Sequence, residues 1–293
     1  MNSISQPLVS VLMPVYNSEK YLAEAIDSVV ASTYQNWELI IVDDRSNDRS
    51  HEIAKTFQEK DKRIKVYVNK INLGDYPNRN QAVSYAKGKY LKFVDHDDYI
   101  YPYGLEQLVY YMEQFPEAGY GLCSLPQDKA RIFPFQLNPK EAYTRHYFEQ
   151  PLFHKAPLSA IMKKDCFERA GKFSGKPLLG DFEMWHIMSQ KYPVVLMPQG
   201  IVWYRQHDEQ ESAKNRNDPM EPFKYILLSK KLLIDDRCPL NEKARTQALE
   251  KMEKIEARAI LSAAKHYSFK KSYEMSKTSN MSLIKIIQKG LRR

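Results

Sequence analysis

The sequence has little cysteine and no long hydrophobic run. Its 3 cysteines, Cys123, Cys166 and Cys238, stand far apart and form no Cys-x-x-Cys pair. We therefore exclude zinc and redox sites built on paired cysteines, and we expect three small apolar residues in a reducing cytoplasm. The mean hydropathy is -0.58, no apolar run approaches the ~20 residues of a membrane span, and residues 1–7 lack the basic and apolar regions of a signal peptide. We expect a cytoplasmic protein that is soluble or at most peripheral to the membrane.

Several motifs of nucleotide enzymes and nucleic-acid binders are also absent. The sequence has no Gly-x-x-x-x-Gly-Lys-Ser/Thr loop and no Gly-x-Gly-x-x-Gly turn, so the kinase and dehydrogenase classes have no support. It has no zinc finger, RNP signature or compact basic cluster interleaved with aromatic residues, and we expect no nucleic-acid partner. The formal net charge is nevertheless +8. Such a charge suits an acidic partner, namely a nucleotide, a polyanion or an anionic membrane surface.

What is present is a regular alternation of strand and helix patterns. The 293 residues are 43% hydrophobic, enough to bury a sizeable core. In the first hundred residues, apolar runs predict strands and helical spacing predicts helices, in the chain order strand 8–14, helix 21–31, strand 37–42, helix 51–60, strand 64–68, helix 78–86 and strand 90–94. Alternation of this kind predicts βαβ units and a mainly parallel sheet, which binds its ligand at the carboxyl ends of the strands.

The later part of the chain is less regular and then becomes helical. The pattern predicts, in order, helix 105–114, strand 119–125, long loops with short elements over 126–157, helices 165–170 and 182–190, strands 194–197 and 201–204, and helices 223–234 and 241–266 before a basic segment. We expect two parts, a catalytic α/β domain over residues 1–215 and a helical C-terminal extension over 216–293.

Two groups of carboxylates follow predicted strands. Asp43 and Asp44 end one strand, where either could accept a hydrogen bond from the imide N–H of a base; the alternative is a solvated turn with Asp44 as a helix cap. Residues 95–98, Asp-His-Asp-Asp, place three carboxylates within four positions. These carboxylates repel one another unless a cation is present, and Mg2+ or Mn2+ suits such oxygen ligands. Solvated loop acids are the alternative reading.

The order of these motifs resembles a known family. Residues 14–17 (Pro-Val-Tyr-Asn), 42–46 (Val-Asp-Asp-Arg-Ser), 72–74 (Asn-Leu-Gly) and 95–98 occur in the order seen in inverting family 2 glycosyltransferases of the GT-A fold. The resemblance extends over residues 7–212. It implies a mixed, mainly parallel sheet flanked by helices, a nucleotide diphosphate sugar donor such as a UDP-sugar, and a divalent metal cofactor, Mn2+ or Mg2+.

The resemblance also implies roles for individual residues. It assigns the nucleotide-sugar site to Pro14, Tyr16, Asn17, Asp43, Asp44, Asn72, Arg79, Asp95 and Trp185. Asp43 would pair with the base, and Asp97 would bind the metal. In the segment from Trp203 to Ser212, His207 would close over the metal and diphosphate; the alternative is an ordinary loop histidine.

The catalytic base is expected in an acidic motif that opens a helix carrying a tryptophan. Asp181 and Trp185 match this motif, whereas Gly180 replaces the usual first acid. The resemblance implies that Asp181 removes a proton from the acceptor. The alternative is that Asp181 only caps its helix, with Glu183 exposed and Trp185 in the core.

The predicted reaction is the transfer of one sugar per encounter. The Gln-x-x-Arg-Trp motif of processive members is absent. The resemblance implies a glycan or lipid-linked acceptor in the assembly of cell-surface polysaccharide. A nucleotidyltransferase is the rival enzyme, although its usual Gly-rich loop after the first strand is missing, and a regulatory module with an acidic pocket is the rival of another class.

The C-terminal tail combines an apolar helical face with cations. Leu283, Ile284, Ile287 and Leu291 share one face, and Lys285, Lys289 and Arg292 largely occupy the other. Such a helix could lie on an anionic membrane surface. The alternative is that it packs on the transferase domain or pairs two subunits as a homodimer, since Ile286 falls off the apolar face and Gly290 weakens the helix by up to ~1 kcal/mol.

Overall fold

The computed structural model describes residues 6–207, 210 and 217–291. Its contacts divide the chain into two compact units. The first comprises the chain up to Ala142 together with Leu152–Gln206, and the second comprises Tyr143–Pro151 together with the chain from His207 onward.

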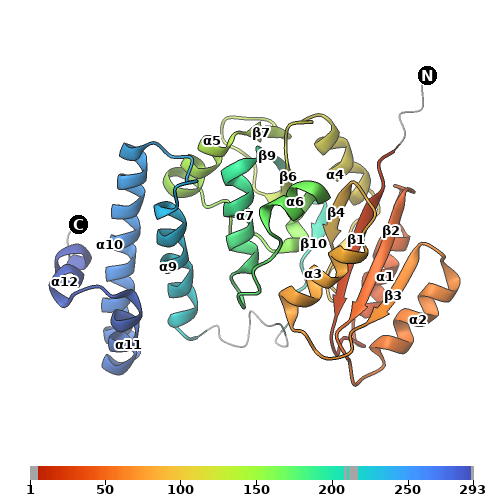
Figure 1. The fold of residues 1–293 in the computed structure, drawn as a ribbon, viewed down its shortest axis with the longest axis horizontal. Helices are drawn as coiled ribbons and strands as arrows, with labels where there is room; N and C mark the ends of the chain where they lie inside the picture. Colours follow the sequence, from red (N-terminus) through yellow and green to blue (C-terminus); the bar gives the residue numbers. More distant parts are fainter. Residues whose placement is uncertain (1–5, 208–209, 211–216, 292–293) are drawn as a thin grey trace. The chain divides into compact units, whose positions relative to one another are not determined.

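The first unit is built on an eight-stranded mixed sheet (Figure 1). Its strands are β1 (Val9–Val15), β2 (Trp37–Asp43), β3 (Ile64–Val68), β4 (Tyr90–Phe93), β6 (Tyr120–Leu125), β7 (Phe135–Leu137), β8 (Ala160–Lys163) and β9 (Val194–Pro198). Their order across the sheet is β3-β2-β1-β4-β8-β6-β9-β7. The pairs β1–β2, β1–β4, β2–β3 and β6–β9 are parallel, whereas β8 is antiparallel to both of its neighbours and β7 is antiparallel to β9.

Helices lie on both faces of this sheet (Figure 1). They are α1 (Leu22–Val30), α2 (Ser50–Lys60), α3 (Asp75–Tyr85), α4 (Gly104–Glu113), α6 (Lys164–Ala170) and α7 (Gly180–Lys191). The chain also forms α5 (Pro139–Thr144) and a 3-10 turn at Pro157–Ser159. A second, two-stranded sheet pairs β5 (Tyr99–Ile100) antiparallel with β10 (Val202–Trp203). Every residue of β1 is buried, which is the pattern expected of a parallel strand covered on both faces.

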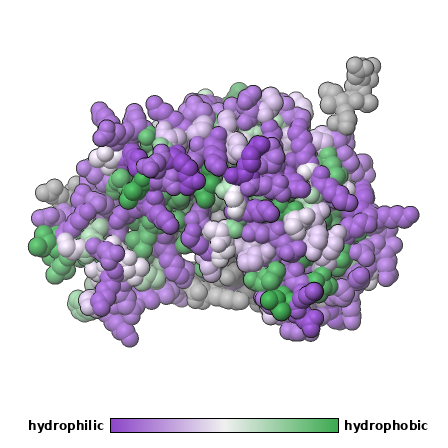
Figure 2. Space-filling view, in the orientation of Figure 1, coloured by the Kyte–Doolittle hydropathy of each residue, from purple (hydrophilic) through white to green (hydrophobic). Residues whose placement is uncertain are grey.

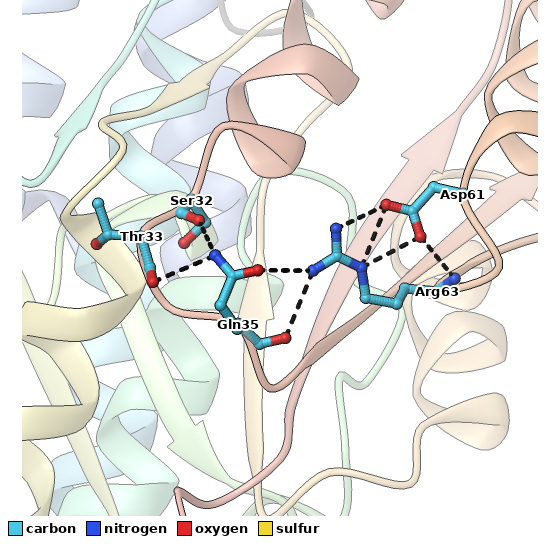
Figure 3. A network of polar contacts seen from close by, with 5 residues as sticks. All are labelled: Ser32, Thr33, Gln35, Asp61 and Arg63. Carbon is cyan, nitrogen blue, oxygen red and sulfur yellow. Dashed lines mark hydrogen bonds and ion pairs between the residues drawn. The ribbon is translucent and has the colours of Figure 1, made fainter.

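Polar contacts fasten the loops that lead into two of the parallel strands (Figure 3). Gln35, just before β2, donates from Nε2 to the carbonyl oxygens of Ser32 and Thr33 at 2.8 and 3.3 Å. Arg63, just before β3, donates to the carboxylate of Asp61 and, at 3.4 to 3.5 Å, to both oxygens of Gln35. The Arg63 guanidinium also lies 3.7 Å from the ring centre of Trp37. These contacts hold the amino ends of β2 and β3, opposite the edge where the acidic residues lie.

The second unit is helical. It contains α9 (Met220–Ile234), α10 (Glu242–His266), α11 (Phe269–Ser279), α12 (Leu283–Leu291) and a π-helical turn at Arg145–Glu149. Its core consists of apolar residues from all four α-helices and from the turn before α12, namely Phe223, Ala257, Ile260, Ala263, Met275, Met281 and Ile286. Asn241 and Ser268 cap α10 and α11 by accepting backbone N–H bonds, which stabilises the start of each helix.

The predicted α/β class with a C-terminal helical region is confirmed, and the strands and helices of the first hundred residues are found within a few positions of their predicted bounds. Helix α3 begins at Asp75, three residues before the predicted start. Strand β8, which was not predicted, separates β4 from β6. All three cysteines are buried and unpaired by disulfides, as expected. Among the described helices, none has the length and apolar character needed to cross a membrane.

Candidate functional site

Three parallel strands bring the acidic segments to one edge of the sheet. Strand β1 pairs in parallel with β2, with Val15 opposite Asp43, and with β4 on its other side, with Leu12 opposite Phe93. The loops after these strands therefore leave the sheet at the same edge. These loops carry the exposed Tyr16, the Asp43–Asp44 pair and the segment from Asp95 to Asp98.

Asp44 is buried, and its hydrogen bonds connect two loops. Its side chain is 2% exposed. Oδ1 accepts hydrogen bonds from Asn69 Nδ2 at 2.7 Å and Leu73 N at 2.8 Å, and Oδ2 accepts one from Gly74 N at 2.8 Å. Asp44 does not cap a helix, because α2 begins at Ser50 and Asp48 accepts the N–H of that residue. Both carboxylate oxygens of Asp44 thus hold the 69–74 loop, which makes an acidic residue necessary here irrespective of any ligand.

Asp43 and Asn17 join the loops after β1 and β2. Asp43 Oδ1 accepts hydrogen bonds from Ser46 N at 3.1 Å and Ser46 Oγ at 2.5 Å. Asn17 has a positive φ of 49°; its N–H donates to Ser46 Oγ at 2.9 Å, and its Oδ1 accepts from Asn47 N at 2.8 Å. Pro14 is buried in β1, whereas Tyr16 is 46% exposed. Of the predicted base-binding residues, Tyr16 and Asn17 are therefore exposed, whereas Pro14 and Asp43 are buried.

The loop before α3 brings Asn72 to the same edge. Gly74 has a φ of 85°, a conformation that a residue with a Cβ atom adopts only with strain. Its N–H, besides contacting Asp44, lies 3.1 Å from Asn72 Oδ1. This turn ends the loop and begins α3 at Asp75.

Arg79 on α3 forms a bidentate pair with Asp95. Nη1 and Nη2 donate to the two carboxylate oxygens of Asp95 at 2.6 and 3.0 Å, and Nε donates to Asp75 Oδ1 at 2.7 Å. Burial by itself would raise the pKa of Asp95, but the charge and hydrogen bonds of Arg79 outweigh burial and lower that pKa. Asp95 is therefore ionised, and both of its oxygens are engaged by Arg79.

The acid cluster that follows β4 is short of positive charge. Asp98 is 2% exposed; its Oδ1 accepts a hydrogen bond from Arg205 N at 3.1 Å, and Arg205 Nε donates to the carbonyl oxygen of Asp97 at 2.8 Å. Burial, followed by the negative charges of Asp95 and Asp97, raises the pKa of Asp98 to about 8. The charge of the buried Lys92 opposes this rise only in part, and burial lowers the pKa of Lys92 itself to about 8.

The donor set suits a cation that takes most of its ligands from a substrate. Among the described residues, no group of three His, Cys, Asp or Glu side chains could hold a metal ion by itself. Mg2+ and Mn2+ typically use one or two carboxylates together with phosphate oxygens and waters. Asp97, on a loop whose carboxylates repel one another, fits this description, and within the described part of the chain the neighbouring His96 has a buried Nδ1 with no hydrogen-bond partner.

Asp181 opens α7 beside the ring of Tyr76. Its backbone N–H donates to the Tyr76 hydroxyl at 3.2 Å, and its Oδ1 accepts from Phe182 N at 2.6 Å. Burial raises the pKa of Asp181 to about 6, partly opposed by the Phe182 N–H, the charge of Arg79 and the Tyr76 hydroxyl. A carboxylate with a pKa near neutrality is suited to general base catalysis.

The geometry explains why glycine precedes Asp181. A Cβ atom at Gly180 would lie 2.7 Å from Cζ of Tyr76, closer than two carbon atoms can approach. The Tyr76 ring also packs against Phe173, with ring centres 5.0 Å apart. The ring of Tyr76 on α3 therefore occupies the space that an acidic side chain at position 180 would need.

The remaining residues of this motif are buried. Trp185 is fully buried, donates from Nε1 to the carbonyl oxygen of Lys155 at 2.6 Å and stacks on Tyr120. This is the core position that the sequence left open as the alternative to ligand binding. Glu183 is buried, not exposed, and contacts Ser174 and Lys176. Glu183 thus fastens the loop before α7.

Helix α3 links the two halves of the site. It carries Arg79, which contacts Asp95, and Tyr76, which contacts Asp181. The sequence did not point to Tyr76 or Arg205, because their partners lie 105 and 107 or more positions away in the chain. His207 belongs to the second unit, and its role as a metal ligand stays a prediction. Ser212 lies outside the described residues.

The fold agrees with the comparisons with known proteins. Residues 10–171 match the family described as glycosyl transferase family 2. This segment is more than half of the chain, and the protein therefore belongs to glycosyl transferase family 2.

Individual relatives agree with this assignment. An uncharacterized glycosyltransferase of Haemophilus influenzae is 38% identical over 133 residues, which are 44% of this chain and 53% of that protein. The match thus spans about half the length of this relative. Residues 1–349 of S. aureus TarS, solved in complex with UDP-GlcNAc, have a TM-score of 0.69 at 18% identity, covering 96% of this chain and 81% of that one. A mannosyltransferase of Pyrobaculum calidifontis, PcManGT, solved with GDP-Man and Mn2+, has a TM-score of 0.64 at 17% identity, covering 98% and 87%. These likenesses show the GT-A type fold.

Proposed function

We propose that the protein is an inverting, non-processive glycosyltransferase that moves one sugar from a nucleotide diphosphate sugar, such as a UDP-sugar, to a hydroxyl acceptor. The observation that carries this proposal is the arrangement around α3. One helix joins a carboxylate with a pKa of about 6, Asp181, to an acid cluster at the carboxyl ends of parallel strands. Helix α3 therefore contacts both the proposed base and the acid cluster proposed to face the diphosphate.

The donor occupies the edge formed by the loops after β1, β2 and β4. Tyr16 offers an exposed ring to the base, and Asp43 accepts the imide N–H of that base. Arg79 keeps Asp95 ionised. Asp95 lies near the ribose and the donor sugar. The complexes of TarS with UDP-GlcNAc and of PcManGT with GDP-Man support a nucleotide sugar as the donor class.

A divalent cation, Mn2+ or Mg2+, completes the donor site. Asp97 holds it, with His207 as a further ligand. When bound, the cation neutralises the charge that develops on the diphosphate leaving group. The surplus of carboxylates around Asp97 and the Mn2+ present with PcManGT support this assignment.

The chain's own residues perform the proton transfer. The carboxylate of Asp181 takes the proton of the acceptor hydroxyl as its oxygen attacks the anomeric carbon, and the bond from that carbon to the diphosphate breaks. Attack from the side opposite the leaving group inverts the anomeric configuration. The Phe182 N–H donates to this carboxylate, and the Tyr76 hydroxyl, which accepts the backbone N–H of Asp181, also stabilises the ionised side chain.

The catalytic domain is taken as residues 1–215, and residues 216–293 as its helical extension. The acceptor is a glycan or a lipid-linked glycan of cell-surface polysaccharide assembly. The protein works in the cytoplasm as a single subunit or a homodimer.

A thermal-shift panel of nucleotide sugars, with and without Mn2+, tests the donor class. A ligand at 100 times its dissociation constant stabilises the folded state by about 2.7 kcal/mol. We expect a uridine or guanosine diphosphate sugar to raise the melting temperature only with Mn2+ present. No stabilisation by any nucleotide sugar, with Mn2+ or without it, would refute the proposal.

A further inference from the structure

Helix α12 packs on α10 through one side and leaves its predicted apolar face outside. Ile286 is 1% exposed in the core of the second unit. Lys285 and Lys289 reach Glu253 of α10 with Nζ–Oε distances of 2.5 and 3.1 Å. These contacts define the side of α12 that faces the protein.

A glycine makes this packing close. A Cβ atom at Gly290 would lie 2.5 Å from Leu261 Cδ1 on α10. Gly290, which weakens the isolated helix, thus lies in the contact with α10, where a larger side chain would require Leu261 to shift. Because Ile286, Gly290 and the two lysines fix the helix on α10, its rotation is set and the outward residues are defined.

The outward residues are the four aliphatic side chains that share one helical face. Leu283, Ile284, Ile287 and Leu291 are 70%, 70%, 46% and 72% exposed. Figure 2 shows hydrophobic surface at the left edge, where Figure 1 places α12. Scattered exposed apolar residues are ordinary, but a contiguous face of four on one short helix marks an interaction site.

The same end of the sequence is strongly basic and carries exposed aromatic rings. Residues 265–293 contain 8 lysines and arginines and a single acid, Glu274, so this segment accounts for +7 of the net charge of +8. Tyr267, Phe269 and Tyr273, in and just before α11, are also exposed. Aliphatic side chains, aromatic rings and an excess of basic over acidic residues are the composition of segments that lie in the headgroup region of anionic bilayers.

We propose that the outward face of α12, together with the lysines of residues 265–277, docks the protein on an anionic lipid bilayer. The four aliphatic side chains offer no hydrogen-bonding group for a polar partner, whereas acyl chains accept them directly. The excess of lysine and arginine selects an anionic surface over a neutral one. This docking is independent of the proposed reaction, since it uses neither the acid cluster nor Asp181.

Vesicle sedimentation tests the proposal on the full chain. Ile284→Ser with Leu291→Ser removes two outward side chains that are one heptad apart and contact solvent, so the melting temperature is expected to stay the same. Ile132→Ser is the matched control, because Ile132 is 92% exposed in the first unit. We expect the wild type and the control to sediment with phosphatidylglycerol vesicles and not with phosphatidylcholine vesicles, and the double variant to bind roughly tenfold more weakly or worse. Binding is expected to fall as salt rises from 0.1 to 1 M, because the Debye length shortens from ~10 to ~3 Å.

Three outcomes would overturn the proposal. The first is that the wild type ignores anionic vesicles or binds neutral ones equally well. The second is that the double variant binds as tightly as the wild type. The third is that light scattering shows a wild-type dimer that the double variant loses, which would make the outward face a contact between two copies of the chain.

Discussion

Replacing Asp181 by asparagine should stabilise the protein while it lowers turnover roughly a hundredfold or more. The folded state raises the pKa of Asp181 from 3.8 to about 6. At pH 4 the carboxyl is protonated in the folded chain and only about half ionised in the unfolded chain, so its effect on stability is still small, and the effect vanishes at lower pH. As pH rises from about 4 to about 6, the unfolded chain ionises first, and the wild type loses stability. Asparagine mimics the protonated form and should escape this loss.

The size of the effect follows from the shift. Two pKa units correspond to at most about 3 kcal/mol at 1.36 kcal/mol per unit. The Asp181 side chain is partly accessible to water, so solvent screening reduces this figure, and we expect about 1 kcal/mol. For a unit of this size, 1 kcal/mol corresponds to about 2–4 °C in melting temperature.

Thermal melts at pH 4 and pH 8 provide the assay, with Asp27→Asn, an exposed position on α1, as the control. We expect Asp181→Asn to melt about 2–4 °C above the wild type at pH 8 and close to it at pH 4, while transfer of sugar falls roughly a hundredfold or more. A variant that melts below the wild type at pH 8 would show that the folded state does not raise the pKa of Asp181. A variant that transfers sugar at the wild-type rate would show that another residue is the base.

Three further predictions concern the residues around Asp181 and the acid cluster. Tyr76→Phe removes a hydroxyl that lowers the pKa of Asp181, so the acidic limb of the kcat/KM profile should move to higher pH while calorimetry shows unchanged nucleotide affinity; an unmoved limb would exclude a role for the hydroxyl. Asp97→Ala should weaken nucleoside-diphosphate binding roughly tenfold or more in Mn2+, and equal affinities by calorimetry would contradict the metal assignment. Arg79→Ala leaves Asp95 buried without its partner and should cost about 3–5 kcal/mol in urea unfolding, whereas a loss below 1 kcal/mol would mean that water replaces the guanidinium.

The sequence predicts the parts of this fold that depend on local patterns. Strands β1 to β4 and the helices between them are visible because each carries its own apolar run or helical spacing. Strand β8 is four residues long and is a strand because β4 and β6 lie on either side of it. Such short segments depend on tertiary pairing, which local pattern does not contain.

The site was predictable to a similar extent. Four of the candidate residues stand at or next to the ends of predicted strands and helices, where their motifs can be recognised in the sequence, namely Asp43, Asp95, Asp97 and Asp181. The Tyr76–Asp181 contact joins residues 105 positions apart, and nothing local to either residue indicates it. For the tail, the helical period predicts which residues share a face, but Ile286 and Gly290 decide which face meets α10.

The contact between Gly180 and the Tyr76 ring limits how the two positions can change during evolution. A larger residue at position 180 collides with the ring unless position 76 becomes smaller in the same lineage, and a smaller residue at 76 opens space that a side chain at 180 can fill. The two positions should therefore covary among homologues, with tyrosine beside glycine and a small residue beside an acid. Chains of the second kind would carry two adjacent carboxylates at the start of α7, and the repulsion between them would change the proton affinity of the carboxylate at position 181.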